Sequence, residues 1–235
     1  MIKLVEVYKD YSGISVLNGV TFNVKYGDIV TLIGKIGGGK STIINIICGL
    51  LKPDKGHVYI DNKRIGVLNR DYIKDVGFIL SGDYLIEDFS TILYWDCIGR
   101  LLNLKKEFIK ERIKFLLDLC EISDPKMPIS KLSSGNQMLV KIGTMLLHSP
   151  KLLVVDEPFN QLDIGEISKI EKILFDCQNN GNTIFMTSHY PEPIFNLSNE
   201  ILLLEGGIIK ENITQKKFVD YTSFRNNLSD YFKKA

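Results

Sequence analysis

A chain of 235 residues is long enough for one large domain, or for one domain with a smaller subdomain, and needs no disulfide or metal to hold its core. Its hydrophobic content of 45% and charged content of 24% are ordinary for a folded globular protein and exclude disorder of the whole chain. The 29 basic and 28 acidic residues leave a formal net charge of +1, so the overall charge does not predict a nucleic-acid partner.

The cysteines and the apolar segments indicate the compartment. No two of Cys48, Cys97, Cys120 and Cys177 have CxxC spacing, so we expect buried or neutral thiols in a reducing compartment. The N-terminus meets charge too early for a signal peptide. The richest apolar stretch, 43–51, is far too short to span a bilayer. We therefore expect a soluble cytosolic chain that reaches the inner face of the membrane only through a partner.

Strands dominate the first part of the chain. Alternating or continuous apolar residues separated by glycine turns predict strands over 4–8, 20–24, 29–33, 57–61 and 76–80. A helix is expected over 41–51. From about 90 to 148 the apolar residues recur at three- and four-residue spacing, which predicts a mostly helical block. Trp95 lies on the apolar stripe of that block, so we expect it in the core.

Strands and helices alternate again after the helical block. We expect strands over 152–155 and 183–187, a helix over 164–177, a hairpin over 201–209 and a helical tail after 214. This alternation predicts an α/β fold with a mainly parallel sheet, into which the block 90–148 is inserted.

A glycine-rich loop lies between the strand 29–33 and the helix that follows. Residues 34–41 read Gly-Lys-Ile-Gly-Gly-Gly-Lys-Ser and fit G-x-x-x-x-G-K-[ST]. Glycines let the backbone curl so that its N–H groups converge on phosphate oxygens, and the helix start adds a positive dipole end. Lys40 is placed for the β and γ phosphates, and the Ser41 hydroxyl for Mg²⁺. The alternative is a glycine-rich turn with a solvated lysine, which this strand–loop–helix context makes unfavourable.

Two adjacent carboxylates follow the apolar strand 152–155. Asp156 and Glu157 would be costly at the end of a buried strand without a compensating cation, and Mg²⁺ held by phosphates supplies that charge. We expect Asp156 to face the metal and Glu157 to face the attacking water as a general base. A solvated strand end before a proline turn is the alternative.

Three further motifs surround this acidic pair. Residues 132–136 (Leu-Ser-Ser-Gly-Asn) precede it, 160–163 (Asn-Gln-Leu-Asp) follow it, and Thr187-Ser188-His189 ends the next strand. Together with the glycine loop, these motifs resemble the ATP-binding subunit of ABC transporters. The resemblance covers the chain up to about residue 212, and four ordered motifs at the right spacing make it specific.

The resemblance implies a fold and its subdivisions. It implies a P-loop NTPase, RecA-like, with a mainly parallel sheet core, an antiparallel β subdomain and an inserted helical subdomain. The chain would be a single ABC ATPase domain over 1–235. Its core and β subdomain would occupy 1–89 and 149–212, its helical subdomain 90–148, and a helical tail 213–235.

The resemblance also implies roles for residues. Residues 34–42 match Walker A, 152–157 Walker B, 132–136 the signature and 160–163 the D-loop. The implied nucleotide-binding residues are Tyr11, Gly34, Lys35, Ile36, Gly37, Gly38, Gly39, Lys40, Ser41, Thr42, Ser133, Ser134, Gly135, Asn136 and Asp163. The implied catalytic residues are Lys40, Glu157 and His189, and the implied Mg²⁺ ligands are Ser41 and Asp156. Two chains would sandwich two ATP molecules, each signature closing over the partner's nucleotide.

Some implied roles have simpler alternatives. Tyr11, implied to stack on adenine, lies beside Ser12-Gly13 and could be a turn tyrosine. His189, implied to contact the γ phosphate, could be a surface histidine. Residues 133–135 are also an ordinary helix N-cap, and we expect them to be both N-cap and signature.

The sequence departs from the family pattern at several positions. Ser81 stands where the family has a glutamine that reaches the Mg²⁺ and the catalytic water, so the rate and the coupling are in doubt and a water could fill the gap. Lys35-Ile36 replaces the usual Pro-Asn of Walker A. Ser134 and Asn136 replace a glycine and a glutamine of the signature, which are mild changes.

The intact catalytic motifs predict an active ATPase that needs ATP and Mg²⁺. We expect it to power transport, and export in particular, through a separately encoded transmembrane permease subunit and a second nucleotide-binding subunit, with no nucleic-acid partner. The alternative is a non-transport or regulatory ATP switch with low turnover. The transported substrate would bind to the partner and lies beyond this sequence.

Overall fold

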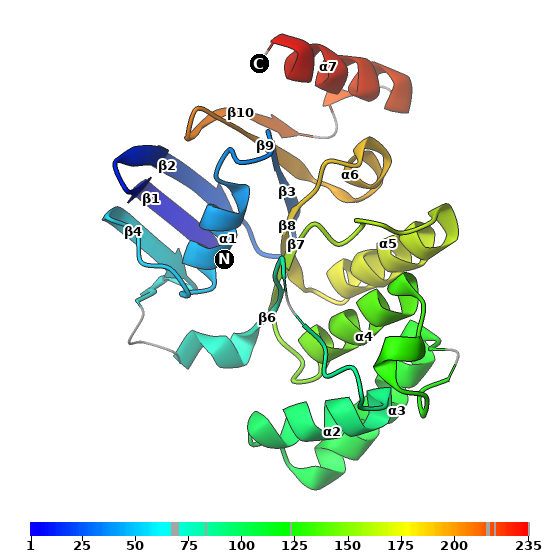
Figure 1. Ribbon diagram of the computed structural model, residues 1–235. Coiled ribbons are helices and arrows are strands. Elements are labelled where there is room, and N and C mark those ends of the chain that lie inside the picture. The colour runs from blue at the N-terminus through cyan, green and yellow to red at the C-terminus, as the bar shows by residue number, and fades with distance from the viewer. Residues whose placement is uncertain (67–70, 83, 123, 215–216, 219, 235) are drawn as a thin grey trace.

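The computed structural model describes residues 1–66, 71–82, 84–122, 124–214, 217–218 and 220–234, and these residues form two β-sheets covered by helices (Figure 1). The larger sheet has six strands in the order β10-β9-β3-β8-β7-β6. Adjacent strands from β9 to β6 run parallel, and β10 pairs antiparallel with β9 at the edge. The strands are β3 (Ile29–Gly34), β6 (Val76–Ile79), β7 (Leu152–Asp156), β8 (Thr183–Thr187), β9 (Glu200–Glu205) and β10 (Ile208–Thr214).

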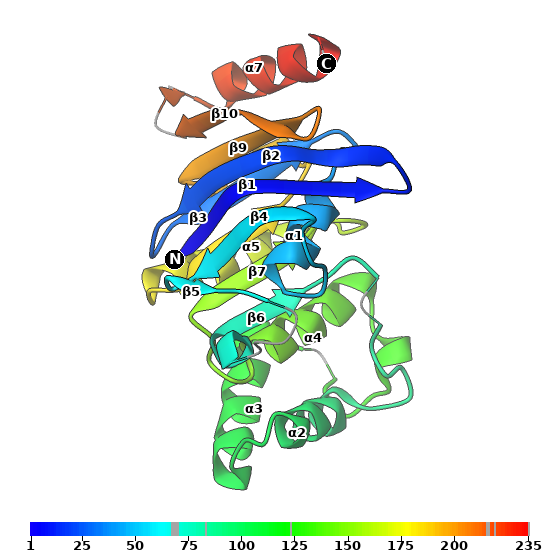
Figure 2. The ribbon, with the colours of Figure 1, turned by 90° about the vertical axis from the view of Figure 1, so that its left-hand side faces the viewer.

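The smaller sheet is antiparallel and has the order β2-β1-β4-β5. Figure 2 shows β1 between β2 and β4. Its strands are β1 (Ile2–Tyr11), β2 (Ile14–Val24), β4 (Lys55–Ile60) and β5 (Lys63–Arg64). The tight connection between β1 and β2 makes a hairpin, whose end carries Tyr11.

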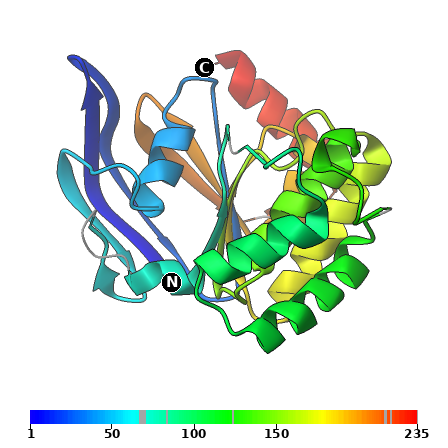
Figure 3. The same ribbon diagram turned by 60° about the horizontal axis from the view of Figure 1, so that its bottom comes forward.

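Helices fill the space between the sheets and cover the outer face of the larger one. Helix α1 lies between the two sheets, and Figure 3 shows it enclosed by them. Helices α4 and α5 lie on the opposite face of the larger sheet, with α2 and α3 beyond them (Figure 1). The helices are α1 (Lys40–Ile47), α2 (Thr91–Leu101), α3 (Lys106–Cys120), α4 (Ser134–Leu146), α5 (Ile164–Asn179), α6 (Pro191–Leu197) and α7 (Tyr221–Lys234), with short 3₁₀ turns at Asp71–Asp75 and Ile129–Lys131.

Strand β7 shows why the sheet takes this central position. All five of its residues are buried. Successive side chains of a strand point to opposite faces, so Leu152 and Val154 pack in the cluster around α1, whereas Leu153 and Val155 pack among α4 and α5. A continuous apolar run therefore serves two cores at once, as expected for a parallel strand covered on both faces.

The helical block packs around a buried tryptophan. Trp95 of α2 has no exposed surface, and its Nε1 donates to the carbonyl oxygen of Val140 and to Oγ1 of Thr144, both at 3.1 Å. The prediction that Trp95 belongs to the core is confirmed. Gly143 of α4 allows the close approach, because a Cβ there would lie 2.1 Å from the indole ring.

The predicted fold class is confirmed, and the differences are local. The predicted helix 41–51 ends at Ile47, because Gly49 takes a left-handed φ of 65° that stops it. Helix α6 was not predicted; Pro191 stands at its first helical position, where proline is tolerated. The tail helix begins only at Tyr221.

The cysteines differ in their exposure to solvent. All four cysteines are free; Cys48, Cys120 and Cys177 are buried, and Cys97 is partly exposed. Burial raises the pKa of Cys120 to about 12 and that of Cys177 to about 11. Among the described residues, no helix combines the length and the hydrophobicity that crossing a membrane requires.

Candidate functional site

The glycine loop joins the carboxyl end of β3 to the first residue of α1. Two of its glycines have left-handed backbones, Gly37 with a φ of 75° and Gly39 with a φ of 101°. A side chain at Gly39 would also collide with Leu17, since its Cβ would lie 2.9 Å from a methyl group of that residue. Gly39 caps α1 without a side-chain hydrogen bond, so no N-cap side chain occupies the N–H groups of the first turn, and the start of a helix favours an anion.

Lys40 lies across the mouth of this loop. Its ammonium group donates to the carbonyl oxygens of Gly34 at 2.9 Å and Lys35 at 3.2 Å. Ser41 is exposed and Thr42 half-buried, both in the first turn of α1. Residues 35–38 and 204–206 line a cavity of about 230 Å³ beside the loop. The loop therefore holds the Lys40 ammonium group against its own carbonyl oxygens and has a small cavity beside residues 35–38.

Asp156 ends β7 as a buried carboxylate with two hydroxyl partners. Only 5% of its surface is exposed. Its Oδ1 accepts from Thr187 Oγ1, and its Oδ2 accepts from Ser81 Oγ, both at 2.5 Å. These hydrogen bonds replace part of the hydration that the carboxylate loses when it is buried. The structure thus places Ser81 in direct hydrogen-bond contact with Asp156.

Glu157 and His189 meet at the ends of neighbouring strands. Nδ1 of His189 lies 2.9 Å from Oε2 of Glu157; the carboxylate is 14% exposed and the imidazole 55% exposed. Glu157 has a left-handed φ of 53°, a conformation uncommon outside glycine, and its N–H donates to Oγ1 of Thr187 at 3.0 Å. This hydrogen bond stabilises the backbone conformation that orients the Glu157 carboxylate.

The loop, the acidic pair and the histidine share one edge of the larger sheet. Strands β3, β8 and β7 are adjacent and parallel, so their carboxyl ends lie side by side. The loop follows β3, His189 follows β8, and Glu157 follows β7. Ligands of open parallel sheets bind at such an edge.

The signature residues lie elsewhere. Ser133 is the N-cap of α4, and its Oγ accepts from the N–H of Asn136, so the predicted N-cap is confirmed. Ser134 Oγ donates to the carbonyl oxygen of Gln161 at 3.4 Å. Because α4 and the helix of the glycine loop cover opposite faces of the sheet, the structure does not bring this segment onto the chain's own loop (Figure 1).

Asp163 and Tyr11 have local contacts. The carboxylate of Asp163 caps α5 by accepting from the N–H of Glu166 at 2.8 Å. Tyr11 is 44% exposed at the end of β1, with the ammonium of Lys9 5.7 Å from its ring centre. The hairpin that carries Tyr11 reaches the glycine loop through Leu17, which lies against Gly39.

Sequence reasoning gave no role to two residues of this region. Thr187 connects the carboxylate of Asp156 to the backbone of Glu157, but a buried threonine at a strand end carries no signal of its own. Glu166 binds the start of α4. Its signal was present, because Asp163-x-x-Glu166 fits the capping-box pattern.

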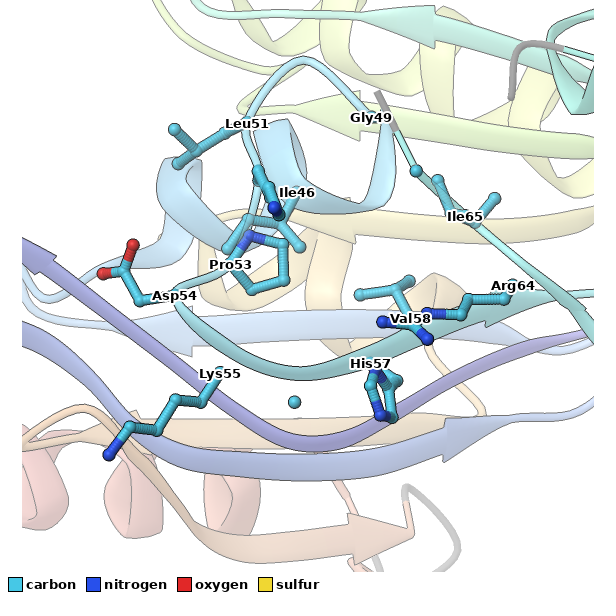
Figure 4. A pocket seen from close by; sticks show the side chains of 13 residues that line it. Ile46, Gly49, Leu51, Pro53, Asp54, Lys55, His57, Val58, Arg64 and Ile65 are labelled. Atoms are coloured by element: carbon cyan, nitrogen blue, oxygen red, sulfur yellow. The ribbon is translucent and has the colours of Figure 1, made fainter. Parts of the chain in front are cut away.

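A second cavity lies away from these residues. It has a volume of about 620 Å³ and lies between the carboxyl end of α1 and β4. Figure 4 shows its apolar lining of Ile46, Pro53, Val58 and Ile65. None of the motif residues lines it, so the chemistry described above belongs to the edge of the sheet at the other end of α1.

These features define a P-loop nucleotide-binding protein, and comparison with known proteins identifies its family. The model of the ABC transporter family matches residues 17–160. An uncharacterised ABC transporter ATP-binding protein of Methanocaldococcus jannaschii is 30% identical over 88% of this chain and 74% of its own length. The cell division ATP-binding protein FtsE of Bacillus subtilis is 27% identical over 94% of this chain and 100% of its own length.

Solved structures agree. A dimeric ATP-binding cassette in a post-hydrolysis state, bound to ADP and Pi, has a TM-score of 0.82 and 28% identity over 93% of this chain and 100% of that one. An ATP-binding cassette of an ABC transporter in its ADP conformation has a TM-score of 0.84 and 25% identity over 98% of this chain and 95% of that one. The chain belongs to the ABC transporter family, as an ATPase that binds its nucleotide in an ATP-binding cassette.

Proposed function

We propose that this chain hydrolyses ATP to power transport by a separately encoded transmembrane partner, on whose cytoplasmic side it lies. The observation that carries the proposal is the pair Glu157–His189, which stands on the same sheet edge as the glycine loop. Export is the direction we propose. It is supported by relatives named as a lipoprotein-releasing system ATP-binding protein and as a Nod factor export ATP-binding protein.

The loop residues would bind the phosphates. The N–H groups of the loop and of the first turn of α1 would bind phosphate oxygens, and Lys40 would leave the carbonyl oxygens of Gly34 and Lys35 to reach one of them. A charge-assisted contact of this kind is stronger than the neutral contacts it replaces. Lys40 thereby neutralises charge that spreads over the phosphate oxygens during transfer.

Two oxygen groups of this chain fit Mg²⁺. The Ser41 hydroxyl is exposed at the start of α1, and the Asp156 carboxylate is presented at the strand end with its two hydroxyl partners. Oxygen ligands of this kind suit a hard cation. When bound, the ion supplies charge neutralisation to the phosphates. Asp156 would carry the charge that attracts it.

Glu157 would orient the attacking water and accept its proton. Its carboxylate is mostly buried but points to the sheet edge, where a water beside the terminal phosphate would stand. His189, in contact with Oε2, would fix the orientation of that carboxylate, and its exposed ring would be free to contact the terminal phosphate. The arrangement supports in-line attack on the γ phosphate.

A second nucleotide-binding subunit would complete the site. The signature segment 133–136 opens α4 on the face of the sheet opposite α1, so it cannot cover the nucleotide of its own loop. The N–H and hydroxyl donors of a helix N-terminus suit the phosphates of a nucleotide held by another chain, once they leave their present acceptors within this chain. The dimeric assembly of a similar solved cassette supports this arrangement.

Glu157→Gln tests the proposal, because it removes the base and preserves the shape. We expect MgATP binding to persist, turnover to fall by about two to three orders of magnitude, and an MgATP-dependent dimer to appear in size-exclusion chromatography with light scattering. Adding Lys40→Ala in the same background should abolish that dimer. Hydrolysis at the parental rate by Glu157→Gln would overturn the assignment of the base.

The coupling to transport needs a test in the native cell. A tagged Glu157→Gln chain should be recovered with the membrane fraction and released by alkaline carbonate, which removes peripheral proteins. Recovery wholly in the soluble fraction, with ATP hydrolysis intact in the parent, would overturn the transport role and favour the non-transport switch.

A further inference from the structure

One carboxylate of this chain occupies the start of the signature helix. Oε1 of Glu166 accepts from the N–H of Gly135 at 3.1 Å and from the hydroxyl of Ser133 at 3.3 Å. The N–H of Gly135 lies in the first turn of α4, where N–H groups have no acceptor within the helix, and Ser133 is the N-cap of that helix. An anion therefore already stands at the positive end of this helix.

The fit between Glu166 and the helix start is close. A Cβ at position 135 would lie 2.0 Å from Oε1 of Glu166, so the glycine allows the carboxylate to reach the backbone. Gly135 is buried, whereas Ser133 and Ser134 are exposed, so the surface of the signature remains open to a second molecule.

Glu166 is also tied to its own helix. Its Oε2 accepts from the N–H of Asp163 at 3.2 Å, and its own N–H donates to Asp163, which completes a capping box at the start of α5. The two oxygens thus bridge two helix starts. Moving the carboxylate off Gly135 breaks one side of this bridge and leaves the Asp163 cap in place.

We propose that Glu166 competes with the nucleotide of the second subunit for the signature, and so sets the ATP concentration at which two chains close. The inference rests on the proposed function, in which residues 133–136 bind a phosphate held by the partner chain. The N–H of Gly135 and the hydroxyl of Ser133 can each serve one acceptor, so Glu166 must move when a phosphate arrives.

Charge decides the direction of the effect. A carboxylate and a triphosphate repel each other, and a carboxylate holds an N–H donor more strongly than a neutral carbonyl does. Glutamine at this position keeps an oxygen that can accept from Gly135 and removes the charge. Glu166→Gln should therefore help two chains close around ATP, whereas the loss of a merely structural contact would weaken the signature and hinder closure.

The experiment uses the Glu157→Gln chain, so that hydrolysis does not reopen the dimer. Light scattering at fixed protein concentration gives the MgATP concentration for half-maximal dimer. We expect Glu166→Gln to lower it about fivefold, since the difference between a charged and a neutral hydrogen bond is on the order of 1 kcal/mol. Glu107→Gln removes a carboxylate from the first turn of α3 and is the matched control, expected to change nothing.

A second measurement separates the two hypotheses. Binding of a fluorescent ATP analogue to dilute monomer reports on the glycine loop alone and should be the same in all variants. If the Glu157→Gln parent binds the analogue and never dimerises, the proposed function falls, and this inference with it. If the parent dimerises and Glu166→Gln closes at an equal or higher MgATP concentration, the competition by Glu166 is overturned alone.

Discussion

The hydroxyl group of Ser81 donates a hydrogen bond of 2.5 Å to Oδ2 of Asp156, which joins the segment after β6 to the carboxylate at the end of β7. The other oxygen of that carboxylate is held by Thr187 from β8. Three adjacent strands thereby fix the orientation of one buried acidic group. Position 81, where the family pattern has the longer glutamine, is thus connected to the acidic pair through a short side chain.

We expect Ser81→Ala to lower the steady-state turnover of ATP by about threefold to tenfold. The change removes one of the two hydrogen bonds that orient Asp156, and the net contribution of a typical hydrogen bond, about 0.5–1.5 kcal/mol, corresponds to a change of this size. ATP affinity should change little, because the glycine loop is untouched. Ser81→Gln should hydrolyse ATP at least as fast as the parent, since its amide can reach beyond Asp156.

Turnover and calorimetric ATP affinity should be measured for both Ser81 variants, with the exposed Ser229→Ala of α7 as a control. Identical turnover in all four proteins would show that residue 81 takes no part in catalysis. If turnover falls as much in Ser81→Gln as in Ser81→Ala, the site requires the direct hydrogen bond from Ser81 to Asp156 and gains nothing from a longer side chain.

His189→Ala should lower turnover more than it lowers ATP affinity. The imidazole contacts Oε2 of Glu157 and is largely exposed, so its removal frees the carboxylate without disturbing the core. A loss of about 10²-fold in kcat is expected for a misoriented base. Comparison of kcat with KM checks this: a rise in KM at unchanged kcat would contradict a role in orienting Glu157.

The strands and the glycine loop could be predicted because their signals are local. The apolar run 29–33 and the motif that follows it need no tertiary information, and the structure places strand β8 over the predicted residues Thr183–Thr187. Parallel neighbours also follow from buried apolar strands that alternate with helices. The position of the acidic pair at a strand end was therefore accessible from the sequence.

Contacts between distant segments were not accessible in this way. The bond from Ser81 to Asp156 joins residues 75 positions apart, and the bond from Gly135 to Glu166 joins residues 31 positions apart. No local pattern predicts which donor meets which carboxylate, because the answer depends on how the sheet and α5 are packed. The capping box at Asp163 could be predicted from the sequence, but the hydrogen bond that Glu166 accepts from Gly135 could not.

The contact between Gly143 and Trp95 makes a stability prediction. Gly143→Ala places a methyl group 2.1 Å from the indole ring, where the buried ring must shift, and should lower the free energy of unfolding by about 2 kcal/mol. Gly165→Ala is the matched control in α5, since its nearest neighbour would be 3.4 Å away, and it should be neutral or stabilising by about 0.5 kcal/mol. Urea unfolding followed by the fluorescence of Trp95 measures both, and equal midpoints would contradict the packing.

The buried thiols of Cys120 and Cys177 predict how the stability of the protein changes at alkaline pH. Burial raises the pKa of Cys120 to about 12 and that of Cys177 to about 11, whereas a thiol exposed by unfolding titrates near 9.0. Because the folded pKa lies above the unfolded one, the stability they contribute is complete below pH 9.0 and is lost as the pH rises through 11 and 12. Between pH 8 and pH 10.5 the loss should be on the order of 2 kcal/mol for each thiol.

Urea midpoints of the parent and of Cys120→Ala/Cys177→Ala, compared at these two pH values, check the sign. The double variant starts less stable at the lower pH because it leaves cavities, but its midpoint should fall less on going to the higher pH. Cys97→Ala removes a partly exposed thiol and should keep the parental pH dependence. Only the change of the urea midpoint with pH, and not the midpoint at the lower pH, reports on the two thiols. An equal fall of the midpoint in the parent and in the double variant would show that other groups, such as tyrosines and lysines, account for the loss of stability at alkaline pH.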